Sequence, residues 1–182
     1  TYHVSYRATV PADLLTNPIY KTTHILLRFI PKGTFQMCGA SGEYGVDSWD
    51  SDEVPHQVTL TKDFYMCVFE ITEAQYANVM GSAAVGTSGS KRPKGTVLYS
   101  AQRGNEGNPA NPPSSSSFVG KLSTKTGKSF DLPTEARWEY ACRAGTTTAL
   151  NNGKNITVMQ GVDPAATEVA WYGEISGSYA HE

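Results

Sequence analysis

The sequence predicts a loop-rich α+β fold with short strands and about three helices. Its 17 Gly and 10 Pro in 182 residues favour turns and loops over a helical bundle. Short segments with alternating apolar residues indicate strands, and three segments with helical spacing and capping residues indicate helices. The length and the hydrophobic content of 39% suit one domain with a substantial core.

The strands are expected in the N-terminal part. Residues 2–10 alternate enough to form an edge strand. Residues 23–37, THILLRFIPKGTFQM, predict two strands that meet at the turn-forming trio 31–33. A loop rich in Gly, Ser and Asp follows over 38–55. Residues 56–72 alternate again and continue as FYMCVFEI, which predicts a second strand of a meander.

Two helices are marked by their caps. In TEAQ, the Thr72 hydroxyl can accept an amide hydrogen while Gln75 reaches back to the cap, which is the pattern of a capping box. This helix is expected to end at Gly81, because glycine adopts the left-handed conformation without strain. The serine run 114–117 is interpreted as the entrance of the next helix, FVGKLSTKTG, which Gly127 ends.

The third helix lies within DLPTEARWEYACRAGTTT, residues 131–148. Pro133 and Thr134 set its start, with Thr134 as the N-cap, and Gly145 is expected to end it. The motif is therefore interpreted as structural.

One face of this third helix is predicted to be apolar. Trp138, Ala141 and Cys142 fall at positions i, i+3 and i+4, which predicts a stripe that packs the tryptophan. Glu139 and Arg143 stand four residues apart on a neighbouring face, in the orientation that favours an ion pair.

Charge, hydropathy and cysteine usage exclude several classes of protein. The net charge of −2 argues against a nucleic-acid surface, and no apolar run is long enough to span a membrane. Both ends are polar without a signal-peptide pattern, so we expect a processed or incomplete chain. Cys38, Cys67 and Cys142 are widely spaced without a CxxC pair, which argues against a zinc ribbon. We expect Cys38 and Cys67 to be small buried hydrophobic residues.

Three segments in order resemble a known family. FIPKGTFQMCGASGE, DEVPHQVTLTKDFYMCVFEITEAQYANVMG and LPTEARWEYACRAGTTT are similar to motifs of the sulfatase-modifying-factor family, whose named member is the formylglycine-generating enzyme. The order is that of bacterial-type members, and the match runs from about Ile30 to Trp171. The resemblance implies a modified C-type-lectin-like fold of the formylglycine-generating-enzyme type. We take residues 1–22 as an N-terminal extension or edge strand and residues 23–182 as the N-terminal part of the family domain, whose C-terminal part is expected to be absent.

The family resemblance also implies a chemistry. Members oxidise a cysteine of a client sulfatase to formylglycine, with oxygen and with copper held by two cysteines, and they also carry calcium. Copper(I) prefers soft thiolate ligands. In the family that cysteine pair lies near the C-terminus, after segments that this sequence lacks, so no catalytic or metal-binding residue is assigned here. Cys142 matches a position that forms a disulfide in the animal enzyme, and Cys38 stands where the family usually has Gly.

Other candidate residues have a functional and a simpler interpretation. His56 lies beside a strand start without a second ligand nearby, so a structural role is favoured over that of a ligand or base. The acidic segment 47–53 lacks the spacing of a calcium loop and is interpreted as solvated. Asn155 begins an N-glycosylation sequon, a minority interpretation in a chain so rich in Asn and Thr. Four aromatic residues are candidates for stacking on a sugar or peptide, or for the core: Tyr99, Trp171, Tyr172 and Tyr179.

The function that the sequence favours is a non-catalytic binding or structural module of this family. Its expected partner is a protein or peptide, or a carbohydrate, and self-association is compatible with its surface. One alternative is the N-terminal portion of a copper-dependent formylglycine-generating oxidase. Another is a subunit of an extracellular protein assembly. Family habit and surface composition suggest a secreted or periplasmic location.

Overall fold

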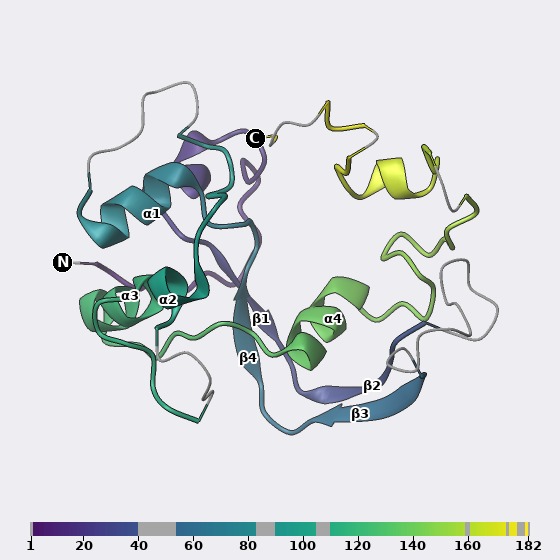
Figure 1. The fold of residues 1–182 in the computed structure, drawn as a ribbon, viewed down its shortest axis with the longest axis horizontal. Coiled ribbons are helices and arrows are strands. Elements are labelled where there is room, and N and C mark those ends of the chain that lie inside the picture. Colours follow the sequence, from purple (N-terminus) through teal and green to yellow (C-terminus); the bar gives the residue numbers. More distant parts are fainter. Residues whose placement is uncertain are drawn as a thin grey trace. The chain divides into compact units, whose positions relative to one another are not determined.

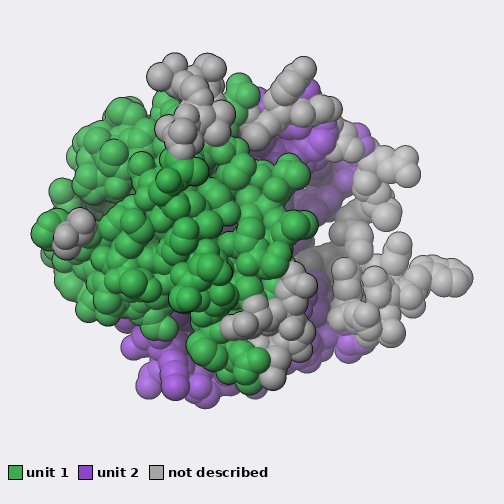
Figure 2. Space-filling view, turned by 60° about the vertical axis from the view of Figure 1, so that its left-hand side comes forward, with its two compact units in different colours: residues 1–27, 67–132, 182 green, residues 28–66, 133–181 purple. Residues whose placement is uncertain are grey.

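A computed structural model describes residues 2–39, 54–82, 90–104, 110–158, 161–173, 175–177 and 181 (Figure 1). The chain divides into two compact units, which Figure 2 colours separately. Unit 1 comprises residues 1–27, 67–132 and 182, and unit 2 comprises residues 28–66 and 133–181. The elements follow in the order η1 (Pro18–Lys21), β1 (Leu27–Ile30), β2 (Gly33–Met37), β3 (His56–Leu60), β4 (Phe64–Cys67), α1 (Glu73–Met80), α2 (Tyr99–Gln102), α3 (Phe118–Thr126), α4 (Glu135–Arg143) and η3 (Ala166–Glu168).

Unit 1 is built around the packing of α1 on α3. Val79 of α1 packs with three buried side chains of α3: Phe118, Val119 and Leu122. The rings of Tyr76 and Phe118 stack with their centroids 5.1 Å apart. Burying four such side chains supplies the main stabilisation of this unit.

The first and last residues of helices α1 and α3 in unit 1 agree with the boundaries predicted from the sequence. Thr72 and Gln75 form the predicted capping box, and Gly81 has the left-handed conformation at the end of α1. Ser117 is the N-cap of α3, since its hydroxyl accepts the Gly120 amide hydrogen at 3.3 Å. Gly127, at φ 67°, ends α3. These four predictions are confirmed.

Unit 2 contains an antiparallel strand pair covered by a helix. β2 pairs with β3 in the register that places Gly33 opposite Leu60 and Met37 opposite His56. β1 pairs with β4, and this second two-stranded sheet lies in unit 2 except for its end residues Leu27 and Cys67. The two strands predicted on either side of residues 31–33 are confirmed as β1 and β2. The meander is wrong, because residues 56–72 contain two strands and the outer pair β1–β4 and the inner pair β2–β3 form separate sheets.

Helix α4 packs on β2 through Tyr140. The Tyr140 ring meets Phe35 of β2 edge to face, with ring centroids 5.2 Å apart. A Cβ atom on Gly33 would overlap the Tyr140 hydroxyl, so a larger residue at this position of β2 would displace the Tyr140 side chain.

The apolar stripe predicted on α4 is wrong. Trp138 is 58% exposed and Cys142 is exposed, and no residue of α4 is fully buried. Trp138 and Tyr140 are two residues apart, which is 200° around a helix, so only one of them can face β2. Since Tyr140 occupies that place, Trp138 points away.

Two boundaries also differ from the prediction. Residues 2–10 form no strand, because the segment has no ladder partner among the described residues, and Val4, Tyr6 and Val10 are exposed. Helix α4 begins at the predicted N-cap Thr134, but Ala144 rather than Gly145 takes the left-handed position after its last residue. Among the described ranges, no helix has the length and apolar character needed to cross a membrane.

Candidate functional site

The motif on α4 holds the end of β2 through its charged pair. The Glu139 carboxylate accepts hydrogen bonds from the Cys38 amide and from the Arg143 guanidinium, both at 2.8 Å. Arg143 also donates to the Cys38 carbonyl oxygen at 2.8 Å and to the Thr148 carbonyl oxygen at 3.3 Å. The predicted i,i+4 pair therefore forms, and it binds both backbone groups of a residue more than 100 positions away.

Cys38 occupies an unusual backbone conformation at this point. Its φ of 68° lies in the left-handed region, where a side chain is strained and glycine is not. This explains physically why the resemblance places glycine at the position. The two backbone hydrogen bonds from Glu139 and Arg143 fix the conformation that the cysteine must adopt.

A second polar centre in unit 2 is the buried Asp163, which is 3% exposed. Its carboxylate accepts five hydrogen bonds, from Thr157 N, Thr157 Oγ1, Val158 N, Ala165 N and Ala166 N. The bonds from the Thr157 and Ala166 amides hold the pKa of this carboxyl well below its usual value. With both oxygens committed, Asp163 ties residues 157–158 to residues 165–166.

In unit 1 the capping box reaches beyond its own helix. The Gln75 side chain, 4% exposed, donates to the carbonyl oxygens of Tyr20 at 3.0 Å and His24 at 2.6 Å. The Thr72 hydroxyl donates to the Lys21 carbonyl oxygen at 2.8 Å. The two residues therefore tie the segment 20–24 to the start of α1.

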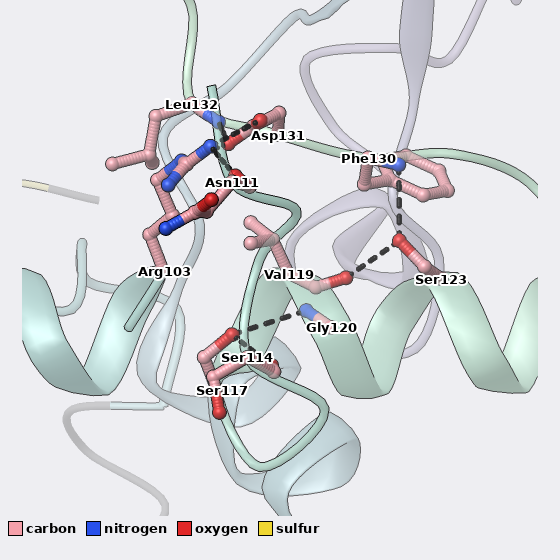
Figure 3. Close-up of polar contacts among 10 residues, drawn as sticks. All are labelled: Arg103, Asn111, Ser114, Ser117, Val119, Gly120, Ser123, Phe130, Asp131 and Leu132. Atoms are coloured by element: carbon pink, nitrogen blue, oxygen red, sulfur yellow. Dashed lines mark hydrogen bonds and ion pairs between the residues drawn. The ribbon is translucent and has the colours of Figure 1, made fainter. Parts of the chain in front are cut away.

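Figure 3 shows a further polar network beside α3. The guanidinium of Arg103, 3% exposed, donates to both oxygens of Asp131 at 2.7 and 3.1 Å and to the Asn111 carbonyl oxygen at 2.7 Å. The hydrogen bond to Asp131 raises the pKa of this guanidinium. Ser123 on α3 in turn accepts the Phe130 amide hydrogen at 3.0 Å. The network holds the segments on both sides of α3.

Copper, which the resemblance implies, requires soft thiolates brought to one place. Burial raises the pKa of the Cys67 thiol to about 11, which disfavours its thiolate near neutral pH. Cys142 is exposed, Cys38 is half-buried, and no disulfide links the three cysteines. Within the described residues, no group of three or more His, Cys, Asp or Glu side chains is placed to hold a metal ion. These residues do not fit a copper site, so no reaction step through copper is derived.

The remaining sequence candidates lie at separate places. His56, at the start of β3, is exposed, with its ring Nδ1 2.8 Å from the Val54 carbonyl oxygen, which agrees with a structural role. Asn155 is exposed and its side-chain oxygen accepts the Ala149 amide hydrogen, so its glycosylation stays a prediction. The acidic segment 47–53 and Tyr179 lie outside the described residues.

The described aromatic candidates have different surroundings. Trp171 is 64% exposed and stacks on the His181 ring at a centroid distance of 4.0 Å. The Tyr172 hydroxyl accepts the Asp163 amide hydrogen at 2.8 Å, so Tyr172 belongs to the loop structure. Tyr99 is exposed on α2. Trp171 and Tyr99 keep exposed surface, and their stacking on a sugar or peptide stays a prediction.

Two buried charged residues, Arg103 and Asp163, were missed by sequence reasoning. Asp163 precedes Pro164 and two alanines, a pattern typical of a helix start that could have indicated its capping bonds. Arg103 lies in a Gly- and Asn-rich stretch without periodicity, so no local signal indicated its burial. Both serve the frame of the unit in which they lie.

Residues 16–181 match the family model described as the sulfatase-modifying factor enzyme 1-like domain. The chain belongs to this family, and its membership confirms the predicted formylglycine-generating-enzyme type of fold. Among solved structures the chain is similar to PvdO from Pseudomonas aeruginosa, with 23% sequence identity and a TM-score of 0.43. The match covers 65% of this chain and 47% of that chain, so the chain spans about half the length of PvdO. No curated protein matches the sequence.

Proposed function

We propose that this chain provides the structural frame of a sulfatase-modifying-factor domain and acts as a non-catalytic binding or structural module. One observation carries the proposal: the polar motif side chains are committed to distant backbone groups. Gln75, Glu139 and Arg143 each bond to the backbone 51 to 105 residues away. Side chains held in this way position loops and are poorly placed for proton transfer, which needs a group within reach of a substrate proton.

Exposed aromatic side chains support the binding part of this proposal. Trp138 and Trp171 are both more than half exposed, and each presents a large flat ring. Tryptophan is enriched at binding surfaces because it buries a large apolar area with little loss of conformational freedom. The expected partner is a protein or peptide, or a carbohydrate, and a location outside the cytoplasm stays part of the proposal.

A copper-dependent formylglycine-generating oxidase is the second candidate function, favoured by the family match over residues 16–181. In that case the chain supplies the frame, and the copper-binding thiolates come from residues outside the printed sequence. A longer sequence with two closely spaced cysteines after the present last residue would favour this candidate.

Oxygen consumption tests the proposed function. The purified chain is supplied with copper and a CxPxR peptide, beside a variant with Cys38→Ser, Cys67→Ala and Cys142→Ser. We expect no peptide-dependent oxygen consumption above that of the variant. Consumption by the native chain that the variant loses would overturn the proposal and assign the chemistry to these thiols.

A further inference from the structure

A groove of about 310 Å³ lies between α1 and α3 in unit 1. Helix α1 contributes the apolar side chains Val79 and Met80, and the segment of α3 contributes ammonium and hydroxyl groups. The residues that line the groove are Val79, Met80, Ser115, Lys121, Thr124 and Lys125. An apolar floor beside a few converging polar groups is the usual composition of a ligand site, and this volume is at the lower end for such sites.

The two lysines of the groove are held in place by uncharged partners. Lys121 Nζ donates to the Met80 carbonyl oxygen at 3.1 Å, and Lys125 Nζ lies 5.3 Å from the centre of the Tyr2 ring. In the part of the chain that the structure describes, no carboxylate forms a salt bridge with either lysine. Like charges four residues apart on a helix repel each other, so an anion bound between them would relieve this repulsion.

The charge of the surrounding unit has the same sign. Unit 1 contains nine Lys and Arg against six Asp and Glu, a net charge of +3, whereas unit 2 contains six against eleven, a net charge of −5. Unit 1 is therefore basic although the whole chain has a net charge of −2. Such a field raises the local concentration of anionic ligands and speeds their association.

We propose that this groove binds an acidic peptide segment in which an aliphatic side chain lies beside carboxylates. The aliphatic side chain would pack on Met80, whose unbranched thioether adapts to different shapes. The carboxylates would pair with Lys121 and Lys125, and the hydroxyl of Ser115 would donate to a carboxylate or backbone oxygen, whereas the Thr124 hydroxyl already donates to the Gly120 carbonyl oxygen at 3.0 Å. The inference rests on the proposed binding-module function and gives it a class of partner.

Fluorescence anisotropy with the labelled peptide DDLDDL tests the proposal on the full chain. Binding should weaken with added salt and disappear when asparagine replaces every aspartate of the peptide. Lys121→Gln and Lys125→Gln should each raise Kd by roughly two- to fivefold, from the usual strength of an exposed ion pair. Lys128→Gln makes the same charge change outside the groove and should alter Kd by less than about twofold.

Each contrary outcome has a separate meaning. Equal effects of all three lysine variants, with unchanged urea midpoints, would overturn the groove assignment while leaving a peptide-binding module elsewhere on the chain. If the asparagine peptide bound as tightly as DDLDDL, the proposal of an acidic-peptide partner would be overturned. It would also be overturned if inorganic phosphate displaced DDLDDL at a concentration equal to that of the peptide. Failure of the proposed function shows instead as thiol-dependent oxygen consumption, which these titrations do not measure.

Discussion

Replacing Gln75 by leucine should destabilise unit 1 far more than its single side chain suggests. The side-chain amide makes three hydrogen bonds with backbone groups: it accepts from Thr72 N and donates to the carbonyl oxygens of Tyr20 and His24. Leucine has a similar volume but no polar atoms, so the change leaves these backbone groups without their partner. The substitution thus separates the hydrogen bonds from the packing.

The expected loss follows from the number of bonds. A hydrogen bond contributes about 1 kcal/mol net, and a buried group that loses its partner costs about 1–3 kcal/mol. With three bonds at a side chain that is 4% exposed, we expect the free energy of unfolding to fall by roughly 3 kcal/mol. Asn78→Leu, on the exposed side of the same helix, removes a single bond to Thr22 and should cost less than about 1 kcal/mol.

Urea unfolding followed by circular dichroism measures both variants. Each change should appear as a lower midpoint with an unchanged slope, because the surface exposed on unfolding is the same. The reasoning fails if Gln75→Leu loses no more stability than Asn78→Leu. In that case the long-range bonds of the capping box would contribute nothing to the frame.

Three further predictions concern single residues. Cys38→Gly should stabilise the chain by roughly 0.5–1 kcal/mol, because relief of the left-handed strain exceeds the entropy lost by glycine, and a lower urea midpoint would contradict this. Burial raises the pKa of Cys67 from its usual 9.0 to about 11, so the stability advantage of the native chain over Cys67→Ala should shrink as the pH rises from about 9 to about 11; a constant difference would refute it. The carboxyl of Asp163 has a lowered pKa, so its stabilising effect should be present above pH 3.8 and fade at more acidic pH. In Asp163→Asn the Thr157 and Ala166 amides should therefore exchange hydrogen faster at pH 7. Unchanged exchange would count against the role given to this carboxylate.

The features that the sequence predicted correctly are local ones. The capping box at Thr72 and the stops at Gly81 and Gly127 depend on residues within one or two helical turns, so a short window contains the whole signal. The strands β2 and β3 also lie within segments predicted to be extended, because the alternation of apolar residues is contained in each segment.

The features that the sequence did not predict depend on distant partners. Helix α4 carries aromatic residues on opposite sides, and only the presence of β2 decides that Tyr140 packs while Trp138 stays exposed. The burial of Arg103 depends on Asp131, 28 residues later, across a stretch with no periodic pattern. The groove between α1 and α3 also requires the packing of two helices that are separated by 37 residues.

The central claim is that the motif residues hold the frame, and the amide of Cys38 tests it most directly. In Glu139→Ala this amide loses its carboxylate acceptor, a charge-assisted bond worth about 1.5–3 kcal/mol. Hydrogen exchange measured by NMR should therefore be at least roughly tenfold faster at Cys38, while the Gly120 amide in unit 1 keeps its rate. Unchanged exchange at Cys38 would contradict the claim, because the Glu139–Arg143 pair would then serve something other than the frame.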